Sequence, residues 1–365
     1  MQSLDEKEWK PIKISDIFET IKPGKISQAN QFEKVSSGGV NYVAATNRNN
    51  GVLYQLEPSE DLKKKVQAGN CIGFIKDGDG SAGYAIYKHE PFASTVNVIY
   101  GYADWLNREN GLFFVAAQDM IEDKYSHGYK RNLQHLRGDK VMLPVDDKDN
   151  PDYAYMAEYT RQKRGAMMDK YRKYAEVRVA ELGEFVEIPA LDEKEWAEFR
   201  IGELFKVSRP MARNKDDYRA GGVPFVASGS VSNGVMKLCE PLDDEPLDKG
   251  CCITVSPVDG STFFQPMDFL GRGGAGSSIL ILRCAGLNMY RGQFMARVIR
   301  QTCSKYTYGH MGNKDSIKRE RIMLPIDDFG EPDYAYMEQY SKNMMLRKYK
   351  QYLEFINCQN VTEVE

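Results

Sequence analysis

The chain of 365 residues has few of the side chains that build metal centres. It holds four histidines and seven cysteines, no Cys-x-x-Cys pair occurs, and Cys251 and Cys252 are adjacent, which makes their side chains diverge. Structural zinc sites need such ligands at short, regular spacings. We therefore expect no metal site, and we expect reduced, mostly buried thiols rather than disulfides.

Long apolar runs are also missing. No stretch approaches the roughly 20 apolar residues of a membrane-spanning helix, and the polar, acidic start does not resemble a signal peptide. With 42% hydrophobic and 28% charged residues, the chain is typical of a soluble globular protein, which predicts a cytoplasmic location and no membrane partner. The net charge of −3 argues against a protein that coats nucleic acid. It leaves room for a sequence reader, because the position of the positive charge then matters more than its total.

Common catalytic motifs are absent too. There is no Gly-x-Ser-x-Gly, His-Glu-x-x-His or P-loop motif, so esterase, zinc protease and P-loop chemistry have no support. Two segments resemble methyltransferase motifs, Asn-Pro-Asp-Tyr at residues 150–153 and Phe-Leu-Gly-Arg-Gly at 269–273. The first has a twin at 331–334 that lacks the amide, and the second lies among turn residues without a counterpart. We therefore predict a non-catalytic chain without a cofactor of its own.

Instead, the chain contains the same series of short motifs twice, in the same order. Leu-Asp-Glu-Lys-Glu-Trp occurs at residues 4–9 and 191–196, and Pro-Asp-Tyr-Ala-Tyr-Met at 151–156 and 332–337. Further matching pairs lie between them, at residues 39–44 and 222–227, 50–52 and 233–235, 79–81 and 259–261, 124–125 and 305–306, and 141–147 and 322–328. So many matches in one order predict a tandem duplication.

Each half has two parts. The first mixes short apolar runs with Gly, Asn and Asp turn signals, which is typical of a compact α+β domain. We expect strands at residues 40–45, 71–75, 96–100, 223–227, 252–255 and 278–282, and helices at 111–122 and 292–303. The second part is a long helix, because Pro151 and Pro332 suit the first helical position and an aspartate follows each at the positive end of the helix dipole.

The predicted fold class is therefore α+β, with two tandem-duplicated globular domains, each followed by a long helix. The expected boundaries are residues 1–148 for the first domain, 149–183 for its helix, 184–195 for a linker, 196–329 for the second domain, 330–358 for its helix and 359–365 for a polar tail.

Apolar residues recur three or four positions apart along both helices. Because neither helix has an obvious partner in its own domain, we expect the two seams to pack together as an antiparallel coiled coil with pseudo-two-fold symmetry. The packing residues would be Met156, Tyr159, Met167, Tyr171, Tyr174, Met337, Tyr340, Met345, Tyr349, Tyr352 and Ile356.

The two halves agree in framework and differ in their loops. Residues 45–51 read Ala-Thr-Asn-Arg-Asn-Asn-Gly, whereas 228–234 read Ser-Gly-Ser-Val-Ser-Asn-Gly. This suits two domains that read different base sequences, because Arg pairs with guanine and Asn or Gln with adenine in the major groove. The candidate base-reading residues are Gln28, Asn30, Thr46, Asn47, Arg48, Asn49, Ser81, Arg213, Ser228, Ser230, Ser232 and Arg272.

Positive charge gathers late in each domain, at residues 124–140 and 305–321, with tyrosines and glycines between the basic residues. Lys and Arg on such loops suit phosphate contacts, which position a protein without specifying sequence. The candidates for contact with the DNA backbone are Lys124, Tyr129, Lys130, Arg131, Lys305, Tyr308, Asn313 and Lys314. The first long helix is also basic, and it could lie along DNA, face a partner protein or be solvated.

A Trp-x4-Ile-x-Asp-Ile-Phe motif opens the first domain at residues 9–18, and a variant with Gly-Glu-Leu opens the second at 196–205. Tyr-Val-Ala and Asn-Gly-Val follow in mid-domain, and Leu-Pro precedes the long helix. In these motifs the chain resembles the specificity subunits of type I restriction–modification enzymes and of related type IIB-like systems. The resemblance covers about residues 9–356.

This resemblance implies a DNA reader. Each globular domain would be a target recognition domain that inserts loops into the major groove and reads one half of an asymmetric, two-part site in double-stranded DNA. The paired helices would set the distance between the halves and dock methyltransferase subunits, two in number, or fused nuclease–methyltransferase subunits. S-adenosylmethionine and Mg²⁺ would be held by those partners. The alternative is a duplicated scaffold whose loops bind protein, which would lack the steep salt dependence of phosphate contacts.

Overall fold

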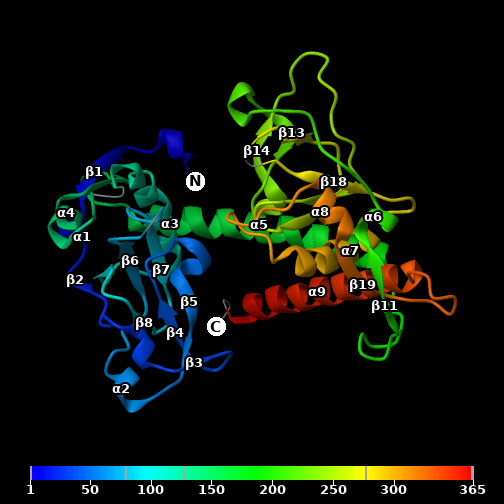
Figure 1. The fold of residues 1–365 in the computed structure, drawn as a ribbon. Helices are drawn as coiled ribbons and strands as arrows, with labels where there is room; N and C mark the ends of the chain where they lie inside the picture. Colours follow the sequence, from blue (N-terminus) through cyan, green and yellow to red (C-terminus); the bar gives the residue numbers. More distant parts are fainter. Residues whose placement is uncertain (1, 79, 126–128, 276–277, 363–365) are drawn as a thin grey trace. The chain divides into compact units, whose positions relative to one another are not determined.

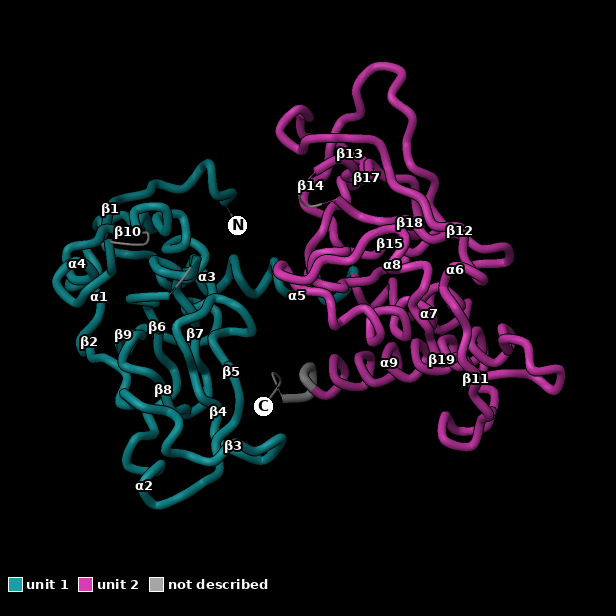
Figure 2. The backbone as a smooth tube through the Cα atoms, viewed as in Figure 1, with its two compact units in different colours: residues 1–170 teal, residues 171–365 magenta. Residues whose placement is uncertain are grey.

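The computed structural model describes residues 2–78, 80–125, 129–275 and 278–362. Figure 1 shows the helices and strands in chain order. The chain divides into two compact units, residues 1–170 and 171–365, and the boundary falls inside the long helix α5, Tyr153–Leu182 (Figure 2). Unit 1 therefore holds the first globular domain and the start of α5. Unit 2 holds the rest of α5, the second domain and the last helix, Tyr334–Thr362 (α9).

The described residues of unit 1 form two four-stranded sheets and a ribbon. The first sheet is antiparallel, in the order Thr20–Pro23 (β2), Val98–Tyr102 (β9), Cys71–Ile75 (β6), Ala85–Lys88 (β7). The second has the order Lys34–Val35 (β3), Val52–Leu56 (β5), Val40–Val43 (β4), Ala93–Ser94 (β8). The ribbon pairs Trp9–Lys13 (β1) with Lys140–Pro144 (β10).

The helices of the first globular domain are short, apart from the one that covers the first sheet. They are Ile14–Ile17 (α1), Glu60–Lys63 (α2), Arg108–Asp119 (α3) and Leu133–Gly138 (α4). Helix α3 packs on β6 and β7, and the core beneath it joins Phe18, Phe74 and Phe114 with Met156 of α5. The core thus ties the start of the long helix to its own domain.

Unit 2 repeats this arrangement. Its antiparallel sheet has the order Lys206–Ser208 (β12), Leu280–Arg283 (β18), Cys252–Val255 (β15), Thr262–Gln265 (β16). The other sheet has the order Val235–Cys239 (β14), Ala220–Val226 (β13), Leu270–Gly271 (β17), and the ribbon pairs Trp196–Arg200 (β11) with Arg321–Pro325 (β19). The helices are Ile201–Leu204 (α6), Met289–Cys303 (α7) and Lys314–Arg319 (α8).

The duplication extends to individual contacts. Trp9 lies opposite Pro144 in the first ribbon, as Trp196 lies opposite Pro325 in the second. The two indole rings stack on Phe113 and Phe294, with centroids 6.0 and 6.3 Å apart. An ion pair also recurs, Lys7–Asp152 at 2.7 Å and Lys194–Asp333 at 2.8 Å. The tandem duplication predicted from the motifs is therefore confirmed in the fold.

Element boundaries differ from the sequence prediction where a cap was missed. The covering helices begin at Arg108 and Met289, three residues before the predicted starts at 111 and 292. Asn107 and Asn288 cap them, since each side chain accepts a backbone N–H of the first turn at 2.9 to 3.0 Å. At the other end of the chain, α9 runs on to Thr362 rather than ending at residue 358.

The expectation that the long helices have no partner in their own domains is wrong. Met156 and Met337 are fully buried in the cores of their own domains. Tyr159 meets Phe113 edge to face at 5.7 Å, and Tyr340 meets Phe294 in the same way at 5.6 Å. These four residues fasten each helix to its domain, because an apolar seam packs equally well on a domain core or on another helix.

Further along the helices, the last part of α5 runs antiparallel to α9 within unit 2. Tyr171 contacts Tyr352 with ring centroids 4.5 Å apart, and Tyr174 contacts Tyr349 at 6.0 Å. These are four of the residues predicted to pack between the helices. Of the other three, Ile356 is buried, Met345 is half-buried and Met167 is 72% exposed. A full coiled coil with pseudo-two-fold symmetry stays a prediction.

Three general features complete the fold. No helix in the described part of the chain is both long and apolar enough to cross a membrane. In the same part of the chain Cys71, Cys239, Cys252 and Cys303 are buried free thiols. Among the same residues, no three His, Cys, Asp or Glu side chains are grouped so that they could hold a metal ion.

Candidate nucleic-acid interface

In unit 1 the candidate site is built on a tight turn after β4. The turn includes Arg48–Gly51 (η3), in which Asn49 and Asn50 have φ of 48° and 47° and Gly51 has φ of 76°. Asparagine and glycine tolerate this left-handed backbone better than other residues. A side chain at Gly51 would also come within 2.6 Å of Ile86. The backbone therefore favours asparagine or glycine at residues 49–51, and the turn displays Asn47, Arg48 and Asn49 to solvent.

This turn is held from behind by β7. The side-chain amide of Asn50 donates to the carbonyl of Tyr87 at 2.9 Å, and Lys88 donates to the carbonyl of Asn50 at 3.5 Å. Lys88 is buried, and its charge is paired with Glu90 at 2.9 Å. These anchors fix the turn on the sheet.

Unit 2 anchors its own turn, Ser232–Gly234 (η6), in the same way. The amide of Asn233 donates to the carbonyl of Phe264 at 3.1 Å, and Gln265 donates to the carbonyl of Asn233 at 3.0 Å. Lys88 and Gln265 therefore both donate a hydrogen bond to the carbonyl of the turn asparagine, one from an ammonium group and the other from an amide. The repeated Asn-Gly-Val motif signalled the turn, but the anchors from β7 and β16 were missed, because only the strand register reveals them.

Three segments of unit 1 meet around the turn. Ser81 donates to the side-chain oxygen of Asn47 at 3.1 Å, which joins the β6–β7 loop to the turn. Lys130 pairs with Asp77 of the same loop at 2.5 Å, and the backbone N–H of Arg131 donates to the carbonyl of Lys76 at 3.0 Å. An open polar hollow lies between the turn and the loop, lined by Thr46, Asn47, Arg48, Gly80 and Ser81.

The base-reading candidates of unit 1 divide into three groups. Asn47, Arg48 and Asn49 are exposed at the turn, and Thr46 is half-buried beside them. Ser81 is 6% exposed and engaged with Asn47, which corrects its assignment as a base reader. Gln28 and Asn30 are exposed on a separate segment, around the short turn Ala29–Gln31 (η2) between β2 and β3.

In unit 2, Ser230 and Ser232 are exposed at the turn, whereas Ser228 is half-buried and donates to the carbonyl of Ser278 at 2.7 Å. Arg272 is half-buried at the end of β17, and in the described structure its buried Nε has no hydrogen-bond partner.

Arg213 does not belong to the site. It is 8% exposed and lies between two carboxylates, Glu245 at 2.6 Å and Asp248 at 2.8 Å. Its guanidinium also donates to the carbonyls of Gly271 and Pro246. The prediction that Arg213 reads a base is therefore wrong, because all of its charge is used inside the domain.

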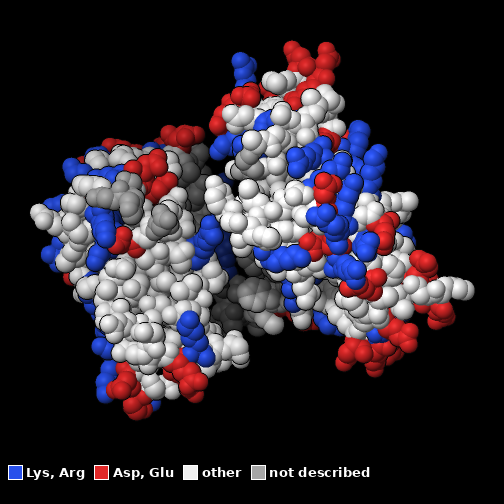
Figure 3. Space-filling model, viewed as in Figure 1, with Lys and Arg blue, Asp and Glu red and all other residues white. Residues whose placement is uncertain are grey.

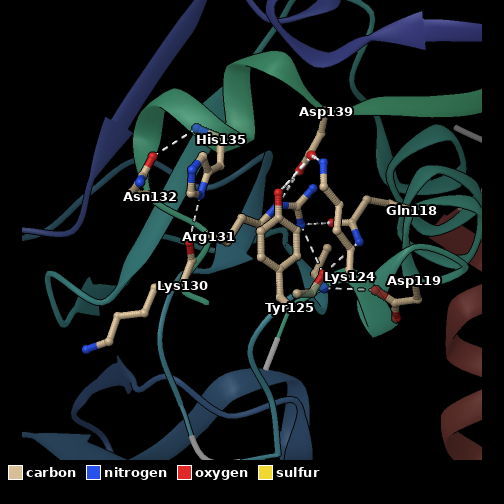
Figure 4. A network of polar contacts seen from close by, with 11 residues as sticks. Gln118, Asp119, Lys124, Tyr125, Lys130, Arg131, Asn132, His135 and Asp139 are labelled. Atoms are coloured by element: carbon tan, nitrogen blue, oxygen red, sulfur yellow. Dashed lines mark hydrogen bonds and ion pairs between the residues drawn. The ribbon is translucent and has the colours of Figure 1, made fainter. Parts of the chain in front are cut away.

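Arg131 is likewise not available to DNA (Figure 4). It is fully buried, with its Nε 2.9 Å from Asp139 and an Nη 2.5 Å from the side-chain oxygen of Gln118. Burial lowers the pKa of the guanidinium, although Asp139 opposes this change. Burial also raises the pKa of Tyr125, whose hydroxyl donates to Asp139 at 2.7 Å. The predicted phosphate contact of Arg131 is wrong, since the loop composition does not reveal these distant partners.

The remaining backbone candidates of unit 1 reach the surface. Lys130 is 58% exposed and points away from the buried network in Figure 4. Lys124 is half exposed and pairs with Asp139 at 2.6 Å. Tyr129 is 46% exposed and stacks on His135 at 4.9 Å. His127 and Gly128, which the sequence placed in the same basic loop, lie outside the described residues.

In unit 2, Lys305 pairs with Glu320 at 2.6 Å and Tyr308 is 86% exposed. Asn313 is a correction, because its side chain caps α8 by accepting two backbone N–H groups at 2.9 Å. Lys314, at the start of α8, is half-buried. Figure 3 shows lysine and arginine side chains gathered on unit 2 around the place of α8. Helix α8 itself carries Lys314, Lys318 and Arg319.

The fold and the site together define a class of protein. One α+β framework occurs twice in the chain, and each copy presents a different set of polar side chains on the same anchored turn. The chain belongs to the type I restriction modification DNA specificity domain family, whose model matches residues 6–165 and 193–354. The two matched ranges correspond to the two halves of the duplication.

The chain is also similar to individual proteins. The chain is 24% identical over 332 residues to the type II restriction enzyme BgcI specificity subunit S.BcgI of Heyndrickxia coagulans, covering 91% of this chain and 93% of that protein. Among solved structures it is similar to the type I restriction-modification S subunit from M. genitalium, with 11% identity, a TM-score of 0.49 and coverage of 99% and 96%. It is also similar to the HsdS subunit from Thermoanaerobacter tengcongensis, with 13% identity, a TM-score of 0.31 and coverage of 96% and 91%.

Proposed function

We propose that this chain is the DNA-reading specificity subunit of a restriction–modification complex, and that each domain reads one half of a two-part site. One observation carries the proposal. The same turn, anchored on the same sheet, exposes Asn47, Arg48 and Asn49 in unit 1 but Ser230 and Ser232 in unit 2. A protein that holds its framework constant and varies the displayed side chains is built for recognition of two different targets.

The displayed side chains fit base edges in the major groove. Arginine can donate two hydrogen bonds to guanine, asparagine can bond adenine, and serine can serve either. Since the two sets differ, the two halves of the DNA site would differ as well. The exposed Lys130 lies on a segment near the turn of unit 1, and the lysines of α8 lie late in the second domain. Both positions suit phosphate contacts.

The chain would act with partners that perform the chemistry. Its relative in Heyndrickxia coagulans is named as the specificity subunit of a restriction enzyme. By this similarity, methyltransferase subunits or fused nuclease–methyltransferase subunits would bring S-adenosylmethionine and Mg²⁺, and the present chain would be non-catalytic.

Selection from randomised duplexes tests the proposal. The chain is combined with a candidate methyltransferase subunit, and bound DNA is sequenced at several salt concentrations. We expect a motif with two defined parts and an undefined spacer, and an affinity that falls steeply with salt. Exchanging residues 45–51 for another loop should alter only one part. A single continuous motif, or no motif, would overturn the proposal, and binding that is insensitive to salt would indicate a protein scaffold instead.

A further inference from the structure

The β6–β7 loop of unit 1 is longer than its counterpart in unit 2. The two loops close alike, because Gly83 donates to the carbonyl of Ile75 at 3.1 Å and Gly260 to that of Ser256 at 2.9 Å. Both glycines have left-handed φ angles, of 93° and 68°. Residues 76–82 therefore correspond to residues 257–259. This corrects the sequence alignment of 79–81 with 259–261, because the structural partner of Gly260 is Gly83.

Arg131 holds both ends of the longer loop. Its backbone N–H donates to the carbonyl of Lys76, where the loop begins, at 3.0 Å. Its guanidinium donates to the carbonyl of Gly83, where the loop ends, at 3.0 Å. Gln118 of α3 donates to the same carbonyl at 2.9 Å and accepts from Arg131 (Figure 4). One buried residue thus closes the neck of the loop, with its backbone at the start and its side chain at the end.

The side chain of Arg131, which we call the clamp, is itself held in place by other residues of the domain. Asp139, at the end of α4, accepts from the Nε of Arg131 and from the hydroxyl of Tyr125. The guanidinium lies over the rings of Phe74 and Tyr125, at 5.0 and 5.3 Å from their centroids. A charge buried in this way keeps one geometry, because any movement would leave the guanidinium of Arg131 buried without its carboxylate.

Unit 2 keeps only the backbone half of this arrangement. Gly312 stands at the position of Arg131, and its N–H donates to the carbonyl of Pro257 at 2.7 Å. Ile299 stands where unit 1 has Gln118, and it is fully buried in an apolar core. In unit 2 the carbonyl of Gly260 accepts instead from the hydroxyl of nearby Thr262 at 3.0 Å, so the shorter loop is closed without an arginine.

We propose that Arg131 is a positioning residue for base reading by unit 1, although it touches no DNA. By closing the neck it fixes the loop whose Ser81 holds Asn47 and whose Asp77 holds Lys130. The presentation of Asn47 and its neighbour Arg48 then depends on a buried residue. This inference rests on the proposed function, and it predicts that the half of the DNA site read by unit 1 depends on Arg131, whereas the other half does not.

The test compares Arg131→Met and Arg131→Lys with the unchanged chain in the full complex. Binding is measured on duplexes altered in one half of the site at a time. For Arg131→Met we expect the discrimination in the unit 1 half to fall about tenfold, as for the loss of one well-placed base contact, while the unit 2 half is unchanged. Arg131→Lys keeps the charge and should retain part of the discrimination. The slope of affinity against salt should not change, because no phosphate contact is lost.

Two further variants separate positioning from folding. Arg213→Met removes a buried arginine of similar chemistry from unit 2 and should leave the unit 1 half unaffected. A second variant copies unit 2 by shortening residues 76–82 to three residues together with Arg131→Gly and Gln118→Ile. It removes the need for the clamp, so it should fold and still lose discrimination in the unit 1 half alone.

The outcomes are distinct. Unchanged discrimination by Arg131→Met in a folded complex would overturn the inference, and so would full discrimination in the variant with the shortened loop. A salt slope reduced by about one would instead show that Arg131 contacts a phosphate directly. If the unchanged complex has no two-part preference at all, the proposed function has failed and not the positioning role.

Discussion

Each unit buries an arginine, but at a different place. In the described structure Arg131 of unit 1 and Arg213 of unit 2 are the arginines with buried side chains. The position of Arg131 is taken by Gly312 in unit 2. The bridge of Ala212 to Gly273 matches that of Ile26 to Thr95, so the counterpart of Arg213 in unit 1 is Ser27. Two copies of one fold have therefore placed their buried charge independently.

Both buried arginines join segments that lie outside the regular strands. Arg131 ties the β6–β7 loop to the start of β10, and Arg213 ties the segment after β12 to the segment at residues 245–248. The apolar core beneath is common to both units, as the stacked Trp9 and Trp196 show. The comparison shows that the two units share the apolar contacts of the framework. Their buried polar contacts differ, together with the lengths of the loops that these contacts join.

The largest effect should come from breaking the buried pair of unit 1. Asp139→Asn leaves the fully buried Arg131 without its carboxylate, and we expect the free energy of unfolding to fall by about 3–5 kcal/mol. The matched change in unit 2 is Glu320→Gln, whose partners are Tyr306 and the exposed Lys305, and there we expect a loss of about 1 kcal/mol. Urea denaturation of the two variants measures the difference. Equal losses would contradict the distinction between the units.

A shared feature gives the next prediction. Gly83 and Gly260 have left-handed backbones, and a side chain at either would come within 2.7 and 2.0 Å of a carbonyl, of Glu122 and Cys303 respectively. Alanine at either position should lower the free energy of unfolding by about 1–3 kcal/mol, with the larger loss at Gly260. Thermal unfolding of both variants tests this, with Gly138→Ala as a control, since nothing lies within 4 Å of an added side chain there.

A pH-dependent effect should be confined to unit 1. Burial, with a smaller contribution from Glu122, raises the pKa of Asp119 to about 6, whereas unit 2 has Arg300 at this position. A carboxyl group with a raised folded pKa favours the folded state below its unfolded pKa, and this stabilisation is lost as the pH rises through the folded value. Allowing for screening at this half-buried site, stability should fall by about 1 kcal/mol between pH 4 and pH 6.

The variant Asp119→Asn isolates this effect, because its amide oxygen can still accept from the N–H of Ala85. The free energy of unfolding of this variant should stay level between pH 4 and pH 6, whereas that of the unchanged chain should fall. Hydrogen exchange at β7 reports on the site directly. A fall that persists in Asp119→Asn would assign the titration to another group.

The smallest effect concerns the surface. Lys130 is 58% exposed, and its counterpart in unit 2 is Met311, which is 56% exposed. Lys130→Ala should weaken binding to all DNA sequences about equally and reduce the salt slope by about one, whereas Met311→Ala should leave the slope unchanged. Asp77→Asn is the control for the lost ion pair. If Lys130→Ala instead changed base preference and left the slope intact, Lys130 would be a base reader.

Much of the fold was predictable from the sequence, because duplicated motifs mark equivalent places. The motifs at residues 4–9 and 191–196 placed both domain openings, and the short apolar runs located strands such as β6 and β15. The covering helices were found with wrong starts, because Asn107 and Asn288 were not recognised as caps.

The site was less predictable, because burial of a polar residue depends on partners distant in the chain. Arg131 lies among lysines and glycines, as a phosphate-binding arginine would, yet Gln118 and Asp139 enclose it. Arg213 was misread for the same reason. The exposed residues of the turn were identified correctly as surface residues, because the repeated Asn-Gly-Val motif fixed the position of the turn.

The anchors of the two turns have a consequence for how such proteins change. The amide of Asn50 and the side chain of Lys88 grip main-chain carbonyls, as do those of Asn233 and Gln265. Main-chain atoms are the same for every amino acid, so residues displayed ahead of the anchor can be exchanged without refitting the support. New target preferences could therefore be selected by randomising residues 47 and 48, because Asn49 has a left-handed φ of 48° and belongs to the support of the turn.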